Sequence, residues 1–73
     1  MNKNFEYKIT QPLGVLSERV GYSVEVNMIS YNDAPPKLDI RRWDNRTQER
    51  RMLKGISLTD EEVEKLKEIL SNL

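Results

Sequence analysis

Alternation of apolar and polar residues dominates the middle of the chain. The segments Ser23–Tyr31 and Lys37–Trp43 both alternate with a period of two, which predicts two β-strands that each bury one side. Between them, Asn32–Pro36 ends in two prolines, and proline cannot donate a hydrogen bond to a strand ladder. The pattern therefore predicts an antiparallel hairpin that turns at Asn32–Pro36.

The apolar sides of the two predicted strands determine their expected register. Pairing Met28 with Ile40 and Asn27 with Arg41 makes the apolar sets coincide on one face, as burial of that face requires. Polar and aromatic residues then gather on the opposite face, namely Asn27, Tyr31, Lys37, Arg41 and Trp43.

Two shorter apolar-leaning runs precede the hairpin. Phe5–Ile9 is predicted to be a short strand ended by Pro12, and Leu13–Arg19 is a second run that stops before a turn at Gly21.

A polar stretch and a further strand follow the hairpin. Asp44–Glu49 is predicted to be a long, mobile loop, and Arg50–Leu58 is predicted to be the fourth strand. Gly55 inside that strand indicates a bulge or a close approach of two backbones.

The C-terminal segment carries the signals of an amphipathic helix. Thr59 and Glu62 form a capping box, in which each side chain bonds the backbone N–H of the other residue. One apolar stripe follows, made of Val63, Leu66, Ile69, Leu70 and Leu73. Strands followed by one helix predict an α+β fold, a single domain over residues 1–73, with the helix on the apolar side of an antiparallel sheet.

Charge is sorted along the chain, although the formal net charge is zero. Residues 37–54 carry seven basic and three acidic side chains, whereas residues 55–73 carry two basic and five acidic ones. The cations therefore concentrate on the second strand of the predicted hairpin and just beyond it. There they lie beside Trp43, the only tryptophan of the chain.

Composition argues against several classes of function. The chain has no histidine and no cysteine, so the commonest general base, the thiol nucleophile and the usual zinc ligands are missing. The three glycines are too scattered for a phosphate-binding loop. No apolar run approaches the length of a membrane span or a signal peptide. We expect no catalysis, no metal or other cofactor, no small-molecule substrate, no membrane partner and a cytoplasmic location, with association to the nucleoid as an option.

Cations beside aromatic rings suit a ligand that has both phosphates and exposed bases. Unpaired bases stack on aromatic rings, and phosphates attract Arg and Lys with release of counterions. The candidates for base stacking are Tyr31 and Trp43. The candidates for phosphate contacts are Arg41, Lys37 and Lys54.

An ordinary solvated sheet face is the alternative explanation of the same pattern. In that case Arg41 pairs with Asp39 or Glu25, and Trp43 covers the end of the sheet. The cations in and after the loop are further candidates for phosphate contacts, or else serve solubility alone: Arg46, Arg50 and Arg51.

Two segments resemble the positive cofactor four family, which comprises transcriptional coactivators with a single-stranded-DNA-binding domain. They are Leu38-Asp-Ile-Arg41, followed by Trp43, and Lys54-Gly-Ile-Ser-Leu58, which runs into an acidic-capped helix. The likeness covers about residues 5–72 and extends to small bacterial homologues of the family.

The resemblance implies a curved four-stranded antiparallel sheet with a C-terminal helix. It also implies a dimer whose helices pack centrally and whose sheets hold unpaired DNA. The implied DNA contacts fall on Arg41, Trp43, Lys54 and Tyr31. Leu53 stands where the family often has another basic residue.

The sequence thus predicts a homodimer that binds single-stranded DNA with little sequence preference, in transcription regulation or in DNA replication and repair. The helix stripe supports self-association through a two-fold contact, because it is large for one small sheet to cover. Two alternatives stay open. One is an adaptor of the transcription machinery whose basic face meets an acidic protein. The other is single-stranded RNA binding, because sensing the 2′-hydroxyl depends on local geometry.

Overall fold

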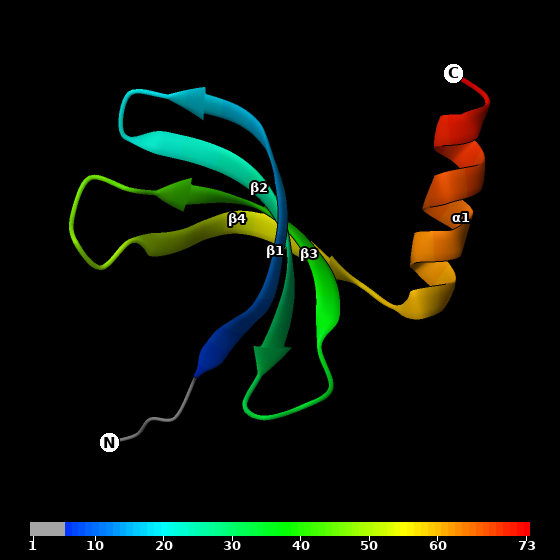
Figure 1. Cartoon of the computed structure of the whole chain (residues 1–73), viewed down its shortest axis with the longest axis horizontal. Coiled ribbons are helices and arrows are strands. Elements are labelled where there is room, and N and C mark those ends of the chain that lie inside the picture. Colours follow the sequence, from blue (N-terminus) through cyan, green and yellow to red (C-terminus); the bar gives the residue numbers. More distant parts are fainter. Residues whose placement is uncertain (1–5) are drawn as a thin grey trace.

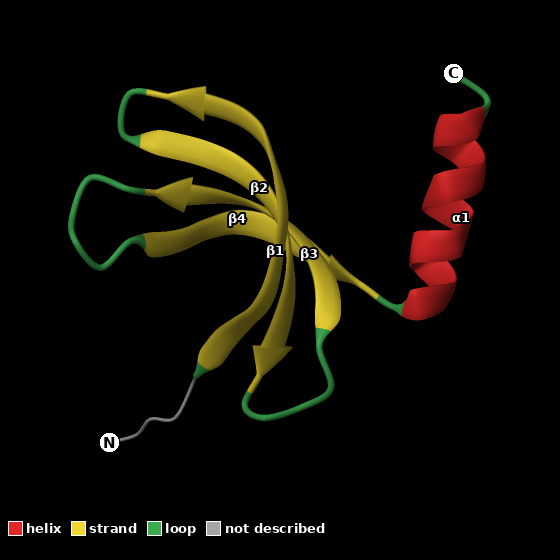
Figure 2. Cartoon of the chain, in the orientation of Figure 1, coloured by secondary structure: helices red, strands yellow, loops and turns green. Residues whose placement is uncertain are grey.

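The computed structural model describes residues 6–73, which form a four-stranded antiparallel sheet followed by one helix (Figure 1). The elements are β1 (Tyr7–Arg19), β2 (Tyr22–Tyr31), β3 (Lys37–Asp44), β4 (Arg51–Leu58) and α1 (Asp60–Ser71). The strands lie in the sheet in chain order, so each joins the next as a hairpin (Figure 2). The predicted α+β fold is confirmed. Within residues 6–73 no helix has the length and apolarity needed to cross a membrane.

β1 is longer than the sequence pattern indicates. The prediction of a strand ended by Pro12 is wrong, because β1 continues through Pro12 to Arg19. β1 is an edge strand, and an edge strand tolerates proline because one side of its backbone has no partner strand. Three register shifts interrupt its pairing with β2, one of them directly after Pro12. The predicted start of this strand at Phe5 lies outside the described residues.

The hairpin of β2 and β3 forms with a register two residues from the predicted one. Asn27 pairs with Asp39, and the connection between the paired residues runs over residues 30–36. This connection is longer than predicted, and it contains two consecutive left-handed residues, Asn32 (φ 51°) and Asp33 (φ 66°). Since the shift is an even number of residues, every side chain keeps its predicted face.

The sheet is strongly bent, and its concave face forms the interior. Tyr7 pairs with Tyr31 and Trp43 pairs with Ser23, so the two pairs lie about 26 Å apart along β2 at about 3.3 Å per residue. The rings of Tyr7 and Trp43 are nevertheless only 5.8 Å apart between centroids. The bulges of β1 accommodate this bend. Ile29 and Trp43, both 0% exposed, lie on this side of the sheet, which we call the concave face.

α1 lies on the other side, which we call the helix face. Its capping box is confirmed: Glu62 N donates to Thr59 Oγ1 (3.2 Å) and Thr59 N donates to Glu62 Oε1 (2.8 Å). The helix contacts β3 and β4 and stands away from the rest of the sheet (Figure 1). No side chain of α1 is buried. Its apolar stripe and the sheet line an open space between them, formed by Leu16, Val26, Leu38, Ile40, Val63, Leu66, Lys67 and Leu70.

β3 and β4 approach closely at Gly55. A Cβ atom at this position would lie 2.5 Å from Arg41 Cβ and 2.7 Å from the Ile40 carbonyl oxygen. The register also shifts in the next pairs, because Arg41 faces Gly55 while Trp43 faces Met52. The sequence predicted a bulge or a close approach, and both are present.

The loop after β3 is anchored at its start, where a mobile loop was expected. The Asp44 carboxylate accepts hydrogen bonds from Arg46 N (3.0 Å), Nε (3.0 Å) and Nη2 (2.9 Å). The Arg46 guanidinium lies over the Tyr22 ring, 5.1 Å from its centroid. The turn before β2 leaves room for this arginine only because residue 21 is glycine: at φ 83°, a Cβ there would lie 2.8 Å from Arg46 Cγ.

Substitution of Gly55 by alanine tests the close approach of β3 and β4. We expect Gly55→Ala to lower the free energy of unfolding by about 1–3 kcal/mol, because the new methyl group overlaps rigid backbone. Gly14→Ala is the matched control, since nothing lies within 4 Å of a Cβ there and its effect should stay within about 1 kcal/mol. Urea denaturation measures both, and equal midpoints for the two variants would contradict the predicted overlap.

Acid titration tests the anchor at Asp44. Hydrogen bonds from Arg46 lower the pKa of Asp44 from 3.8 to about 2. The folded chain therefore binds fewer protons here than the unfolded chain does. The resulting stability is present above about pH 3.8 and is lost as the pH falls through about 2. Urea midpoints measured across this range should fall less steeply for Asp44→Asn than for the unchanged chain, and parallel curves would contradict the assignment.

Candidate nucleic-acid interface

A buried carboxylate organises the concave face. Asp39 is 0% exposed and accepts four hydrogen bonds. Tyr31 Oη (2.7 Å) and Ser57 Oγ (2.8 Å) each donate one, and Arg41 donates two, from Nε and Nη2 (both 2.9 Å). Burial by itself raises the pKa of Asp39, but the hydrogen bonds from Arg41, Tyr31 and Ser57 together lower it. Asp39 is therefore held ionised, and it joins β2, β3 and β4.

Arg41 is fixed on both sides of its guanidinium. Besides Asp39, it bonds the Tyr31 hydroxyl through Nη2 (3.2 Å) and the Leu53 carbonyl through Nη1 (2.8 Å). Leu53 lies at the bulge of β4, where the strand register shifts. The guanidinium thus satisfies a backbone acceptor beside the bulge, and its side chain is only 15% exposed. One of the two alternatives for Arg41, pairing with Asp39, describes its contacts correctly.

Trp43 lies beneath other side chains. Its ring contacts Tyr7 and is covered by Arg50, whose guanidinium carbon lies 4.3 Å from the ring centroid. Within the described residues, its indole Nε1–H is buried without a hydrogen-bond partner. The sequence placed the indole on an open face, whereas here no ring face is open to a base. A bend that brings Tyr7 over Trp43 cannot be inferred from alternation within single strands.

Arg50 is the more exposed of the two arginines of this cluster. It donates to both Glu25 oxygens (2.7 and 3.0 Å), and this contact lowers the pKa of Glu25. Its side chain is 33% exposed, more than twice the exposure of Arg41. Glu25 also accepts a hydrogen bond from Ser23 Oγ (2.7 Å), a contact that does not involve the arginine. Arg50 is therefore a solvent-accessible cover over an otherwise buried indole.

The predicted site residues divide between the two faces of the sheet. The concave face brings together Tyr31, Lys37, Arg41, Trp43 and Arg50. Arg51 pairs with Asp44, the residue after Trp43, and therefore belongs to the helix face, together with Arg46. Lys54 lies beside the bulge opposite Arg42, also toward the helix face. The predicted site residues therefore do not all lie on one face of the sheet.

Tyr7 and Ser57 belong to the concave cluster and were not predicted. Ser57 could have been predicted from alternation. Gly55 pairs with Arg41, so the residue two positions later, Ser57, pairs with Asp39 and lies on the same face. No local signal identifies Tyr7. Within residues 6–73 no group of three His, Cys, Asp or Glu side chains could hold a metal ion.

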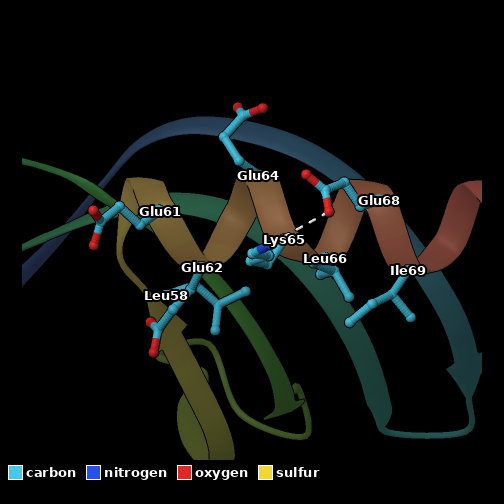
Figure 3. Close-up of a pocket in the computed structure, with 8 residues that line it drawn as sticks. All are labelled: Leu58, Glu61, Glu62, Glu64, Lys65, Leu66, Glu68 and Ile69. Atoms are coloured by element: carbon cyan, nitrogen blue, oxygen red, sulfur yellow. Dashed lines mark ion pairs between the residues drawn. The ribbon is translucent and has the colours of Figure 1, made fainter.

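A second feature is an open groove along α1 (Figure 3). Leu58, Leu66 and Ile69 supply its apolar floor, and Leu66 and Ile69 point to the same side of the helix. Charged residues border it: Glu61, Glu62, Glu64, Lys65 and Glu68. The apolar stripe of the helix continues into exposed positions, with Ile69 63% and Leu70 52% exposed. A large apolar surface therefore faces solvent in the isolated chain.

Comparison with known proteins agrees with this architecture. Residues 20–69, from the first turn through most of α1, match the family described as Transcriptional Coactivator p15 (PC4). The chain is also 36% identical over 74 residues to a protein of Treponema pallidum (strain Nichols) described as uncharacterized, covering all of this chain and 85% of that protein. The family match includes every strand residue of the concave cluster except those of β1. The chain belongs to the PC4 family of transcriptional coactivators, a non-enzymatic family known for binding single-stranded DNA.

Proposed function

We propose that this protein binds single-stranded DNA without sequence preference, as a homodimer, in the cytoplasm of a bacterium. Membership of the PC4 family carries the proposal, since the matched residues contain β2, β3, β4 and most of α1. The processes served are transcription regulation or DNA replication and repair, all of which generate unpaired strands.

The concave face supplies the chemistry for this ligand once Arg50 moves. A phosphate offers Arg50 the same kind of bidentate, charge-assisted contact that Glu25 does, and Glu25 keeps its hydrogen bond from Ser23, so an arriving strand competes with Glu25 for Arg50. Departure of Arg50 from the Trp43 ring uncovers the indole for a base. Stacking on an aromatic side chain is worth about 1–3 kcal/mol per base.

The remaining residues of the concave face divide into contacts and supports. Lys37 is exposed at the end of β3, where it can meet a phosphate directly. Arg41 and Tyr31 are bonded to Asp39, so they offer a fixed surface to the strand. In this proposal Arg41 contributes a pre-oriented positive charge, because its side chain does not need to be ordered on binding.

The apolar surface along α1 supports the homodimer. Ile56, Ile69 and Leu70 are each more than half exposed on the helix or the sheet face beneath it, and Leu73 is 99% exposed. A second copy related by a two-fold axis would cover the same stripe on both chains. Self-association also compensates the thin core of so short a chain.

Tryptophan fluorescence tests the proposed DNA site, because Trp43 is the only indole. We expect single-stranded DNA, but not duplex DNA, to change the emission, since the strand displaces Arg50 from the ring.

The salt dependence of binding tests the phosphate contact of Lys37. Lys37→Gln should reduce the slope of log affinity against log salt concentration by about 0.7, the value of one lost phosphate contact. Lys65→Gln is the matched control with an unchanged slope, because this exposed lysine lies on α1. Equal responses to RNA would extend the ligand to both nucleic acids, and no response to any of them would favour the protein adaptor.

Sedimentation velocity tests the proposed dimer. The unsubstituted chain should sediment as a dimer, whereas the Ile69→Glu variant should sediment as a monomer. The reason is that a carboxylate cannot be buried in the apolar contact without a partner. Val20→Glu is the matched control: this valine is 99% exposed in the turn between β1 and β2, so its substitution should leave the assembly intact. A monomeric unchanged chain at all concentrations tested would overturn the dimer.

A further inference from the structure

The helix face carries a cluster of positive charge, at the end of the sheet far from α1, that the proposed DNA site on the concave face does not use. Arg19, Tyr22, Asp44 and Arg51 face one another across all four strands in one row of the register. Arg42 lies in the adjoining row, paired with Val24, and Arg46 is bonded to Asp44. We call the five cations of this region the distal basic patch: Arg19, Arg42, Arg46, Arg51 and Lys54.

The charge of this patch is unbalanced, unlike that of the concave face. On the concave face Arg41 pairs with Asp39 and Arg50 pairs with Glu25. In the distal basic patch the only carboxylate of the two rows is Asp44, which Arg46 neutralises. The other four cations are exposed and form no ion pair with the described residues. On the concave face Lys37 is also exposed without an ion pair among the described residues, so the helix face carries most, but not all, of the unpaired positive charge of the sheet.

The composition of the patch favours a phosphate backbone over a protein partner. Four of its five cations are arginines, whose planar fork matches the oxygens of a phosphate. The two rows offer little apolar surface for a protein interface, because Val24 and Tyr22 are half-buried and Arg46 covers the Tyr22 ring. Four strands at about 4.8 Å spacing make the patch about 14 Å wide, so more than one phosphate of the same strand can contact it.

We propose that the distal basic patch binds the phosphate backbone of a second segment of nucleic acid, on the opposite side of the sheet from the concave face. The inference rests on the proposed function, since single-stranded nucleic acid is the ligand of both surfaces. β3 connects them directly: Trp43 faces one surface and its neighbours Arg42 and Asp44 face the other. A long strand can then use both surfaces with different segments. The phosphates of one segment release counterions at the distal basic patch, while the bases of another segment stack on the concave face.

The test compares two doubly substituted full-length chains that lose the same charge. Arg42→Gln with Arg51→Gln removes two exposed cations of the patch, and Lys8→Gln with Lys65→Gln removes two exposed cations elsewhere. Long oligothymidine is titrated at several salt concentrations, with anisotropy of a labelled strand reporting total binding and Trp43 emission reporting the concave face. The expected result is a salt slope reduced by about 1.4 for the patch variant alone, with its indole response at saturation unchanged.

Several outcomes would overturn the inference, each in a distinct way. A slope equal to that of the control variant would show that no phosphate is bound at the patch, while an intact indole response would leave the proposed function standing. A changed sedimentation coefficient with unchanged DNA binding would assign the patch to the acidic helix of a second copy. If oligothymidine does not change the Trp43 emission of the unsubstituted chain, the proposed function and the inference are both wrong.

Discussion

The burial of one carboxylate determines how the concave face is built. Asp39 is removed from water, and an ionised group in such a position is tolerated only when its oxygens are fully hydrogen-bonded. Its partners come from β2, β3 and β4, so each strand must lie within bonding distance of the same point. Arg41, the charged partner, then needs space where β3 lies beside β4, and this space exists because its ladder partner, residue 55, has no side chain. The motif residues Asp39, Arg41, Gly55 and Ser57 thus form one structural unit.

This unit explains why the residues of the concave face were predicted to form an exposed binding surface, although in the structure they bond to one another and are largely buried. Alternation assigned Tyr31, Arg41 and Trp43 to one face correctly, because period-two geometry holds whatever the fold. Their accessibility depended on the bend of the sheet and on Tyr7, which lies in a different strand. Charge counting also missed that Arg50 and Glu25 neutralise each other, because they are 25 residues apart in the chain.

The local signals in the sequence were the accurate ones. The Thr59 capping box involves residues three apart and formed as predicted, and Gly55 correctly indicated an irregular pairing of β3 with β4. Two errors arose where nonlocal context decides. Pro12 is compatible with a strand only at a sheet edge, and edge position is a property of the whole sheet. The register of the hairpin differs by two residues, and its turn contains two left-handed residues, a conformation that the pattern of apolar positions does not encode.

The irregular β1 has a consequence for how copies of this chain can assemble. A straight edge strand presents a ladder of free N–H and C=O groups on which another chain can extend the sheet, often into aggregates. Here Pro12 removes a donor, three bulges break the ladder, and the bulged β4 carries Arg51 and Lys54 on the opposite border. Both borders therefore resist intermolecular strand addition, which leaves the apolar stripe of α1 and the sheet face beneath it as the surface for self-recognition.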